Sequence, residues 1–438
     1  MRITFKLIAT LFVSGVFVHS DVFAESRPPN IVLIVADDLG YGDLSCYGNE
    51  FIQTPNLDRM AREGLRFTDF HSNGAVCSPT RAALMTGRYQ QRTGISGVVT
   101  AKGHRHTGLG LEEMTFAEVL KTVNYKTALI GKWHLGYKPE LNPVAQGFDV
   151  YRGFVSGNVD YQIHIDQTGQ EDWWKQDELV PEEGYLTDLI TQHGLNFIKE
   201  NSKDPFLLYL AHAAPHYPYQ ARADPPRYIP GVGRQEDPSS PEVLKEMIEI
   251  MDEGIGDILD QLERAGVLQD TLVIFTSDNG PASHGSSGGL RGKKGSIWEG
   301  GHRVPAIFYW PGHIRPAAVS NELTMTADLW PTFAALGGAS VDHSDIDGVN
   351  LLPHLLEGVA LQDRYMFWGI KKHIAVRKEN YKFIVQQNFQ KPKLYDLDLD
   401  IEETRNISAK HPELAESLLA VAKEWYRDVT DGIEQKTQ

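Results

Sequence analysis

The residues around Cys77 combine a thiol with the signals of a helix start. Ser78 offers a capping side chain, and Pro79 suits the first turn of a helix. Gly87 is typical of a helix end, so the pattern predicts a short helix with Cys77 directly before its first residue. Backbone N–H groups and the helix dipole favour negative charge there, and Arg81 lies one turn further along. This placement predicts either an activated thiol or an anion-binding site.

The chain contains two cysteines, Cys46 and Cys77. In an exported protein two cysteines often form one disulfide, which is the alternative interpretation of Cys77. Whether Cys46 is free does not follow from the sequence.

Two acidic pairs each follow a predicted strand. They are Asp37-Asp38 and Asp278-Asn279. All four side chains offer oxygen atoms, which suit Ca²⁺ or Mg²⁺ and are poor ligands for zinc. Either pair alone fits a turn or a helix cap equally well. Two pairs from different strands, together with Cys77, predict a metal site.

The formal net charge of −16 disfavours nucleic acid as a partner, because nucleic-acid binding requires a basic face. An acidic enzyme that acts on an anion must concentrate positive charge in its active site. Arg81, Lys132 and Lys294 are the cations that could supply this charge to an anionic transition state.

Four apolar segments must position these residues. They are continuous rather than alternating, as expected for strands that are buried on both faces of a largely parallel sheet. Ligand sites of such sheets lie beyond the carboxyl ends of the strands. Each segment leads to polar side chains: Ile31–Val35 to Asp37-Asp38, Thr127–Ile130 to Lys132 and His134, Phe206–Leu210 to His212 and His216, and Leu272–Phe275 to Asp278-Asn279.

Predicted helices alternate with these strands, which indicates an α/β fold: a large doubly wound mixed sheet with helices on both faces. We predict a catalytic domain over residues 25–358 and a small C-terminal α+β subdomain over residues 359–438. The segment 217–240, rich in proline, glycine and charge, is predicted to be a surface loop near the site. The helices are expected at Pro55–Glu63, Thr115–Val123, Leu186–Glu200, Pro241–Ala265 and Pro412–Tyr426, and the C-terminal strands at His373–Arg377 and Tyr381–Gln386.

Residues 1–24 have the pattern of a secretory signal peptide, with an apolar run too short for a membrane span and small residues before Glu25. We therefore expect a secreted or periplasmic protein with no membrane attachment after cleavage. Cleavage removes Arg2, Lys6 and Asp21, a net +1, and changes the formal charge from −16 to −17.

The string Cys77-Ser78-Pro79-Thr80-Arg81 resembles the C-x-P-x-R signature of the type I sulfatases. The resemblance runs from about residue 30 to the C-terminal helix and is to the arylsulfatase and N-acetylgalactosamine-sulfatase branch. It implies a fold of the alkaline phosphatase superfamily. Other segments that match the family are Ala36–Asp43, Gly131–Gly136, Ala214–Pro218, Ser277–Gly280 and Lys294–Gly301.

The resemblance implies that a maturation enzyme, formylglycine-generating or equivalent, oxidises Cys77 to formylglycine. It also implies one Ca²⁺ ion held by the two acidic pairs and the formylglycine oxygen, with no organic cofactor. A hydrated aldehyde has two hydroxyls: one attacks sulfur, and loss of the proton of the other expels sulfate. A serine in this place would form a stable sulfate ester instead.

The same resemblance assigns roles to the basic residues. Arg81 and His134 would contact formylglycine, with His134 as the base for the eliminating hydroxyl. Lys132, His216 and Lys294 would bind sulfate, and His216 or Lys294 would protonate the leaving oxygen.

Substrate-binding residues are expected where the family varies. Each candidate fits an ordinary polar surface residue equally well: Ser156, Asn158, Asp160, His104, His106 and His164.

The sequence therefore predicts a sulfuric ester hydrolase that acts on a sulfated small molecule or glycan. The alternatives are a phosphonate or phosphate ester hydrolase of the same superfamily, and a non-catalytic protein that binds sulfated glycans. The sugar, the position of its sulfate, endo or exo action and the oligomeric state stay open.

Overall fold

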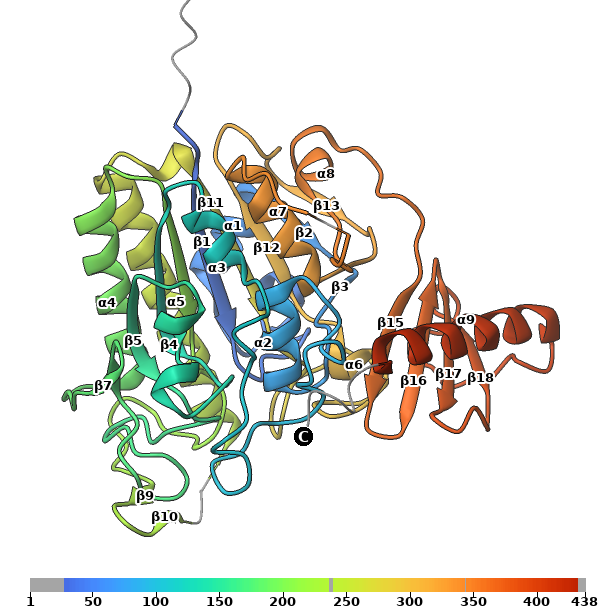
Figure 1. Cartoon of the computed structure of the whole chain (residues 1–438), viewed down its shortest axis with the longest axis horizontal. Coiled ribbons are helices and arrows are strands. Elements are labelled where there is room, and N and C mark those ends of the chain that lie inside the picture. Colours follow the sequence, from blue (N-terminus) through green and yellow to red (C-terminus); the bar gives the residue numbers. More distant parts are fainter. Residues whose placement is uncertain (1–26, 236–238, 343, 432–438) are drawn as a thin grey trace, which may run out of the picture.

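The structure, a computed structural model, describes residues 27–235, 239–342 and 344–431 (Figure 1). The predicted signal peptide lies outside the described residues. The largest sheet has the strand order β13-β2-β12-β11-β1-β8-β4-β5-β6-β7. Its strands are β1 (Asn30–Ala36), β2 (Leu65–Phe67), β4 (Lys126–Lys132), β5 (Val150–Phe154), β6 (Trp174–Lys175), β7 (Glu178–Leu179), β8 (Phe206–Ala211), β11 (Thr271–Ser277), β12 (Ala306–Tyr309) and β13 (Ala318–Ser320).

The four predicted strands are neighbours in the middle of this sheet. β1 pairs in parallel with β11 on one side and β8 on the other, and β8 pairs in parallel with β4. β1, β8 and β11 are buried along their whole length, which explains their unbroken apolar sequences. β12 pairs antiparallel with β11 and with β2, so the sheet is mixed as predicted.

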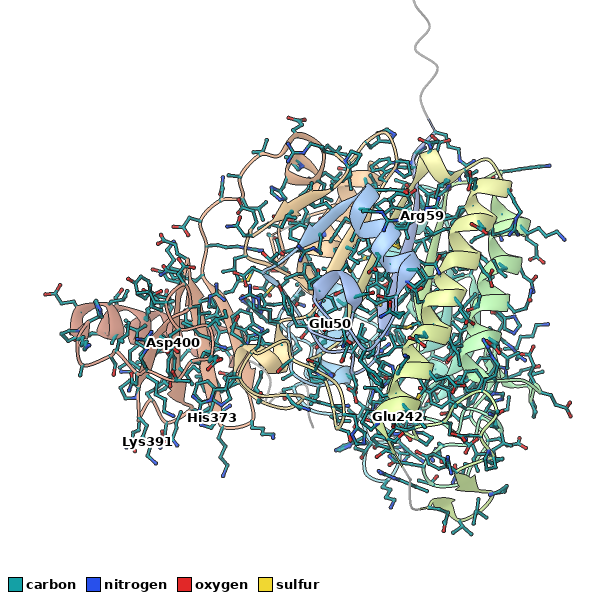
Figure 2. All side chains as sticks on the ribbon, turned by 180° about the vertical axis from the view of Figure 1, so that it is seen from behind. Glu50, Arg59, Glu242, His373, Lys391 and Asp400 are labelled. Carbon is teal, nitrogen blue, oxygen red and sulfur yellow. The ribbon has the colours of Figure 1, made fainter. Side chains whose placement is uncertain are left out.

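Helices cover both faces of the sheet. Alternate residues of β1 belong to two different hydrophobic clusters: Leu33 packs with α2, α3 and α7, and Ile34 packs with α1, α4 and α5. Figure 2, seen from behind, shows Arg59 on α1 and Glu242 at the start of α5 on the second face. This arrangement confirms the predicted fold class. The helices are α1 (Pro55–Glu63), α2 (Cys77–Thr86), α3 (Phe116–Lys121), α4 (Leu186–Asn201), α5 (Pro241–Arg264), α7 (Leu329–Leu336) and α8 (Leu352–Glu357).

The predicted start of α2 is wrong by one residue. Cys77 is the first residue of the helix rather than the residue before it, and Val76 occupies the N-cap position without a side-chain hydrogen bond. Ser78 does not cap the helix, because its hydroxyl accepts a hydrogen bond from Val99 N at 3.1 Å instead. Gly87 ends the helix in the left-handed conformation, as expected. All ten residues of α2 are buried.

A separate antiparallel sheet forms near the C-terminus, which confirms the expected α+β character of this region. Its order is β15-β16-β17-β18, and α9 (Pro412–Thr430) packs on it through Leu418, Ala422 and Trp425. Figure 1 shows this C-terminal sheet beside α6 (Glu299–His302). The domain boundary at residue 358 stays a prediction. The strands are β15 (Met366–Ile370), β16 (His373–Lys378), β17 (Tyr381–Gln386) and β18 (Lys393–Asp396).

Two short pairs complete the described strands. β3 (Phe70–His71) pairs in parallel with β14 (Thr324–Met325). β9 (Tyr228–Ile229) and β10 (Gly233–Arg234) form a hairpin inside the predicted loop 217–240. Among the described helices, none combines the length and the apolar character needed to cross a membrane.

Candidate active site

Segments far apart in the sequence meet at the carboxyl edge of the large sheet. Asp37 and Asp38 follow β1, Asp278 and Asn279 follow β11, and Lys132 is the last residue of β4. Because these strands are parallel, the residues that follow them converge. Hydrogen bonds and ion pairs connect these residues with Cys77, Arg81, His216 and Lys294 in one cluster.

Cys77 lies at the centre of this cluster. Its thiol donates to Asp37 Oδ1 at 3.3 Å, and Lys294 Nζ lies 3.5 Å from its sulfur. Burial and the charge of Asp37 raise the pKa of the Cys77 thiol above its ordinary value. Burial thus disfavours the thiolate of an unmodified Cys77, and the choice between an activated thiol and an anion-binding site stays a prediction. Both cysteines are free, so the alternative of a disulfide between Cys46 and Cys77 is wrong.

The two acidic pairs provide oxygen donors on one side of Cys77. Asn279 Nδ2 donates to Asp38 Oδ1 at 2.7 Å, and Asp38 N donates to Asp278 Oδ1 at 3.3 Å. Asn279 Oδ1 is buried and has no hydrogen-bond partner within the described chain. Burial and the charge of Asp37 raise the pKa of Asp278, a sign that negative charge is in excess here. A divalent cation fits this set of hard oxygen donors, because it would neutralise that charge and use the free amide oxygen.

Three basic side chains surround these carboxylates. Arg81 binds Asp278 Oδ2 through Nε at 2.9 Å and Nη2 at 2.8 Å. Lys132 Nζ donates to Asp37, and Lys294 Nζ lies 2.6 Å from Asp38 Oδ1. Although burial opposes it, the charge of Lys294 lowers the pKa of Asp38 to about 2. Removing these charges from water is costly, so such a cluster is typical of a functional site rather than of a stabilising core.

Two histidines complete the cluster, and both are neutral at pH 7. Burial and the charge of Lys132 lower the pKa of His134 well below its ordinary value, and burial lowers that of His216 to about 3. His134 Nε2 lies 3.0 Å from Val99 O, so Nε2 carries the proton and the unpartnered Nδ1 is a free acceptor. His216 Nδ1 donates to Tyr217 O at 2.7 Å, which leaves Nε2 facing Asp38 at 3.5 Å.

Comparison with known proteins identifies the kind of site. The sequence pattern of the family described as Sulfatase matches residues 29–339. This chain belongs to the sulfatase family. It is an enzyme of the class that hydrolyses sulfate esters, which confirms the resemblance seen in the sequence. The pattern described as N-sulphoglucosamine sulphohydrolase, C-terminal, matches residues 292–426.

Curated relatives of this sulfatase extend over most of its length. Human N-acetylgalactosamine-6-sulfatase is 37% identical over 367 residues, which cover 78% of this chain and 68% of that protein. Human arylsulfatase A is 36% identical over 453 residues, which cover 90% of this chain and 87% of that protein.

Solved structures share the fold. Ps i-CgsB in complex with k-i-k-neocarrahexaose superposes with a TM-score of 0.82 at 31% identity, covering 91% of this chain and 93% of that one. The phosphonate monoester hydrolase of Agrobacterium radiobacter superposes with a TM-score of 0.67 at 21% identity, covering 91% and 95%. The second likeness concerns the fold alone.

The predicted substrate-binding residues of the sulfatase lie in two environments. Asp160 is buried, and its oxygens accept backbone hydrogen bonds from Arg227 (2.5 Å) and Tyr228 (2.9 Å), so it ties two loops together. Asn158 Oδ1 accepts from Tyr228 Oη at 2.6 Å, and Ser156 Oγ donates to Asn158 O at 2.8 Å. Substrate contact by these three residues stays a prediction.

The candidate histidines are dispersed. His164 is buried, with its ring 5.1 Å from that of Trp173. His104 and His106 are exposed on the segment after α2, and His104 Nδ1 lies 3.0 Å from Thr100 Oγ1. His212 is buried, and burial alone lowers its pKa to about 4, in keeping with its exclusion from the predicted catalytic residues.

The sequence pattern did not predict the basic residues of the C-terminal sheet that contact the segment from Lys294 to Glu299. Arg377 and Lys382 both bind Glu299 at the start of α6. Lys371 lies beside Gly295, the residue after Lys294. None of these basic residues stands at the end of a strand of the large sheet, so the signal that located the other cations was absent.

Proposed function

We propose that this sulfatase removes sulfate from a sulfated carbohydrate, with a formylglycine made from Cys77 as its nucleophile. The observation that carries the proposal is the position of Cys77, within hydrogen-bonding distance of both Asp37 and Lys294 at the buried start of α2. The unmodified thiol is protonated there and is a poor nucleophile. Conversion to an aldehyde hydrate, by a maturation enzyme that brings its own two-electron oxidant, would supply the missing nucleophile.

The basic residues would then act on the sulfate ester. One hydroxyl of the hydrate attacks sulfur, the S–O bond to the sugar breaks, and a proton passes to the sugar oxygen from Lys294 or His216. Of these two, Lys294 already carries a proton, since Asp38 raises its pKa well above the ordinary value in spite of burial. Lys132 would neutralise the sulfate oxygens.

Release of sulfate needs a base for the second hydroxyl. His134 is suited to this step, because its neutral ring has Nδ1 free as an acceptor. Removal of the hydroxyl proton restores the aldehyde and expels sulfate, and water hydrates the aldehyde again. The net reaction consumes one water and yields an alcohol and sulfate.

We propose Ca²⁺ as the metal. Asp37, Asp38, Asp278 and Asn279 would hold it, together with an oxygen of the modified residue 77. When bound, the ion would lower the pKa of the attacking hydroxyl and orient the sulfate group.

Substrate class and location form part of the same proposal. A carbohydrate substrate is supported by the name of one relative, N-acetylgalactosamine-6-sulfatase, and by the neocarrahexaose in the complex of Ps i-CgsB. Export to the periplasm or the medium, where sulfated polysaccharides occur, is supported by the signal-like residues 1–24.

Paired aryl sulfate, phosphate and phosphonate esters with the same leaving group test this function. We expect kcat/KM to be highest for the sulfate by at least about 100-fold, a difference of roughly 3 kcal/mol in transition-state binding. Steady-state rates with the matured enzyme measure it. A preference for the phosphonate would instead support the alternative hydrolase of the same superfamily.

A further inference from the structure

A group of buried charges joins the C-terminal sheet to the segment that carries Lys294. Glu299 Oε1 binds Lys382 Nζ at 2.9 Å, and Glu299 Oε2 binds Arg377 Nη1 at 3.2 Å. Glu299 N donates to Glu403 Oε2 at 2.7 Å. Glu299, Lys382 and Glu403 are wholly buried, and Arg377 is nearly so. The C-terminal sheet thus holds the side chain of Glu299, and Glu403, in the loop after β18, holds its backbone.

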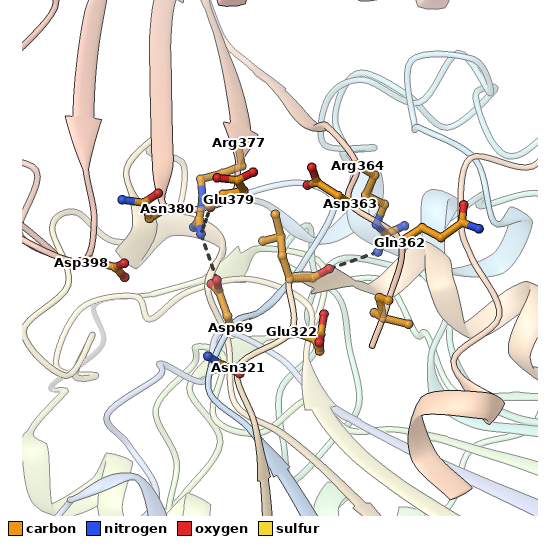
Figure 3. A pocket seen from close by; sticks show the side chains of 12 residues that line it. Asp69, Asn321, Glu322, Gln362, Asp363, Arg364, Arg377, Glu379, Asn380 and Asp398 are labelled. Atoms are coloured by element: carbon orange, nitrogen blue, oxygen red, sulfur yellow. Dashed lines mark hydrogen bonds and ion pairs between the residues drawn. The ribbon is translucent and has the colours of Figure 1, made fainter. Parts of the chain in front are cut away.

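These contacts are part of a closed ring of polar side chains. Lys382 Nζ lies 3.2 Å from His302 Nε2, and the Nδ1 atoms of His302 and His71 are 3.0 Å apart. His71 Nε2 binds Asp69 Oδ1 at 2.8 Å. Asp69 Oδ2 accepts from Arg377 at 2.9 Å, and Figure 3 shows this pair at the wall of a cavity, whose volume is about 460 Å³. The ring consists of Glu299, Lys382, His302, His71, Asp69 and Arg377.

One proton assignment satisfies the contacts between the members of this ring, and it leaves Ile297 O, 3.2 Å from His302 Nε2, without a proton from His302. Burial lowers the pKa of both histidines, so both rings are neutral. Lys382 Nζ donates to His302 Nε2, His302 Nδ1 donates to His71 Nδ1, and His71 Nε2 donates to Asp69 Oδ1. Each imidazole thus has one nitrogen that donates and one that accepts, as a neutral histidine requires. Glu403 pairs with Lys382, and Arg303 pairs with Asp69 and Glu299, so the ring and these two neighbours contain three carboxylates and three cations, which balance in charge. The spacing of His71, Glu299 and His302 would also suit a metal, but the ammonium of Lys382 already supplies the cation.

The segment from Glu299 back to Lys294 is closely packed. A Cβ on Gly300 would lie 2.3 Å from Gly292 O, and one on Gly301 would lie 2.2 Å from Ser296 O. Gly295 N donates to Ala75 O at 2.7 Å, next to the start of α2. Since close-packed segments transmit displacement rather than absorb it, a shift of Glu299 moves Lys294.

We propose that Lys382 and Arg377 are positioning residues for catalysis. They fix Glu299, and thereby keep Lys294 within reach of Asp38 and residue 77. The C-terminal sheet thus helps to position the active site through the contacts of Lys382 and Arg377 with Glu299. Neither side chain contacts the reacting atoms through these contacts. The proposal rests on the proposed role of Lys294 in binding sulfate.

The Lys382→Met variant tests this role, with Lys378→Met as control. Lys378 lies on the neighbouring strand β16 and pairs with Asp363 at the surface. For Lys382→Met we expect kcat/KM on an aryl sulfate to fall at least tenfold, and the Ki of inorganic sulfate to rise by a similar factor. Hydrogen exchange of residues 291–303 should become faster, while the rest of the large sheet stays protected. Lys378→Met should leave all three quantities within twofold of the wild type.

A second variant separates positioning from stability, because Lys382→Met leaves the buried carboxylate of Glu403, 3.0 Å from Lys382 Nζ, without its ion-pair partner and destabilises the fold. Glu403→Gln with Lys382→Met removes one charge of each sign and should restore the melting temperature without restoring Ki or kcat/KM. Wild-type values of Ki, kcat/KM and exchange in this folded double variant would overturn the proposal. A wild-type protein inactive on every sulfate ester would contradict the proposed function instead, and the exchange comparison would still test the positioning.

A different observation concerns the rim of the site. Lys371 lies in the turn between β15 and β16 with a positive φ of 54°. A Cβ on Gly295 would lie 3.4 Å from Lys371 Nζ and 4.0 Å from Val76 Cγ1. The exposed ammonium is thus beside the residues that flank Lys294 and Cys77. Among the described residues, no carboxylate forms an ion pair with it, in a chain whose net charge is −16.

We infer that Lys371 binds a second anionic group of the substrate, so that this sulfatase prefers polyanionic glycans. This inference rests on the proposed function. Lys391 offers a matched control, since it is an exposed lysine with a positive φ of 56° in another turn of the same sheet. Figure 2 shows Lys391 further from the large sheet than His373, which lies two residues after Lys371.

Matched disulfated and monosulfated oligosaccharides test this preference at low ionic strength, where surface charges act most strongly. Lys371→Ala should lower the ratio of the two kcat/KM values about tenfold, and Lys391→Ala should leave it unchanged. A wild-type ratio in Lys371→Ala would overturn the inference. Absence of wild-type activity on both compounds would contradict the proposed function instead.

Discussion

Replacement of Cys77 by serine is expected to abolish multiple turnover and to leave sulfate covalently bound to the enzyme. A serine has one hydroxyl, so it can attack sulfur but has no second hydroxyl whose deprotonation expels sulfate. The surrounding charges remain: Lys294 and Asp37 still face the side chain of residue 77. We expect kcat to fall on the order of 10⁴-fold or more, as when a nucleophile is lost.

Peptide mass spectrometry of the Cys77→Ser variant, digested after incubation with substrate, checks this result. A gain of about 80 Da, the mass of a transferred SO₃ group, is expected on the peptide that contains residue 77. Cys77→Ala serves as the control, since it should neither turn over nor gain mass. In the wild type the same peptide should be about 18 Da lighter than its cysteine form, the change from thiol to aldehyde. Repeated turnover by the serine variant, or activity of a wild type with an intact thiol, would disprove the elimination mechanism.

Removal of the divalent cation should also abolish activity. Asp37, Asp38 and Asp278 are buried together, and Asn279 Oδ1 has no partner in the described chain. A bound metal ion supplies several kcal/mol of stabilisation to such a reaction, so we expect a loss of about 10³-fold on chelation. Added Ca²⁺ should restore the rate, and Zn²⁺ should not, because the donors are hard oxygens.

The Asp278→Asn variant tests whether the activity lost on chelation depends on the oxygen donors of Asp37, Asp38, Asp278 and Asn279. The variant should show a similar loss that added Ca²⁺ does not reverse, and calorimetric titration should show weaker binding of the ion. Asp270→Asn is the control, because Asp270 is exposed directly before β11, whereas Asp278 directly follows this strand. Full activity of the wild type after exhaustive chelation would exclude a catalytic metal.

The core of the site was predictable because it obeys a rule of parallel sheets. Asp37, Lys132 and Asp278 follow three apolar segments, and the carboxyl ends of such strands meet. The helix expected at Thr115–Val123 is present as α3, and Thr115 caps its start in a capping box with Glu118.

Other features depend on contacts that no local pattern encodes. Lys382 is 83 residues from Glu299, on a different sheet, and nothing in its neighbourhood in the sequence marks it as a buried ion. The start of α2 was misplaced because Ser78 and Pro79 have the composition of a cap, while the hydroxyl of Ser78 is used by Val99. Long-range packing decided both outcomes.

The complete burial of α2 bears on whether Cys77 is accessible before or after the chain folds. Cys77 is 2% exposed, and the helix that it begins is enclosed on all sides. A maturation enzyme that binds the residues around Cys77 would have no access to them in the native fold. Under the proposed mechanism, oxidation of Cys77 would therefore have to precede folding, and the two processes would compete for each newly made chain. Conditions that slow folding should then raise the fraction of competent enzyme, whereas a chain that folded first would keep its thiol and stay inactive.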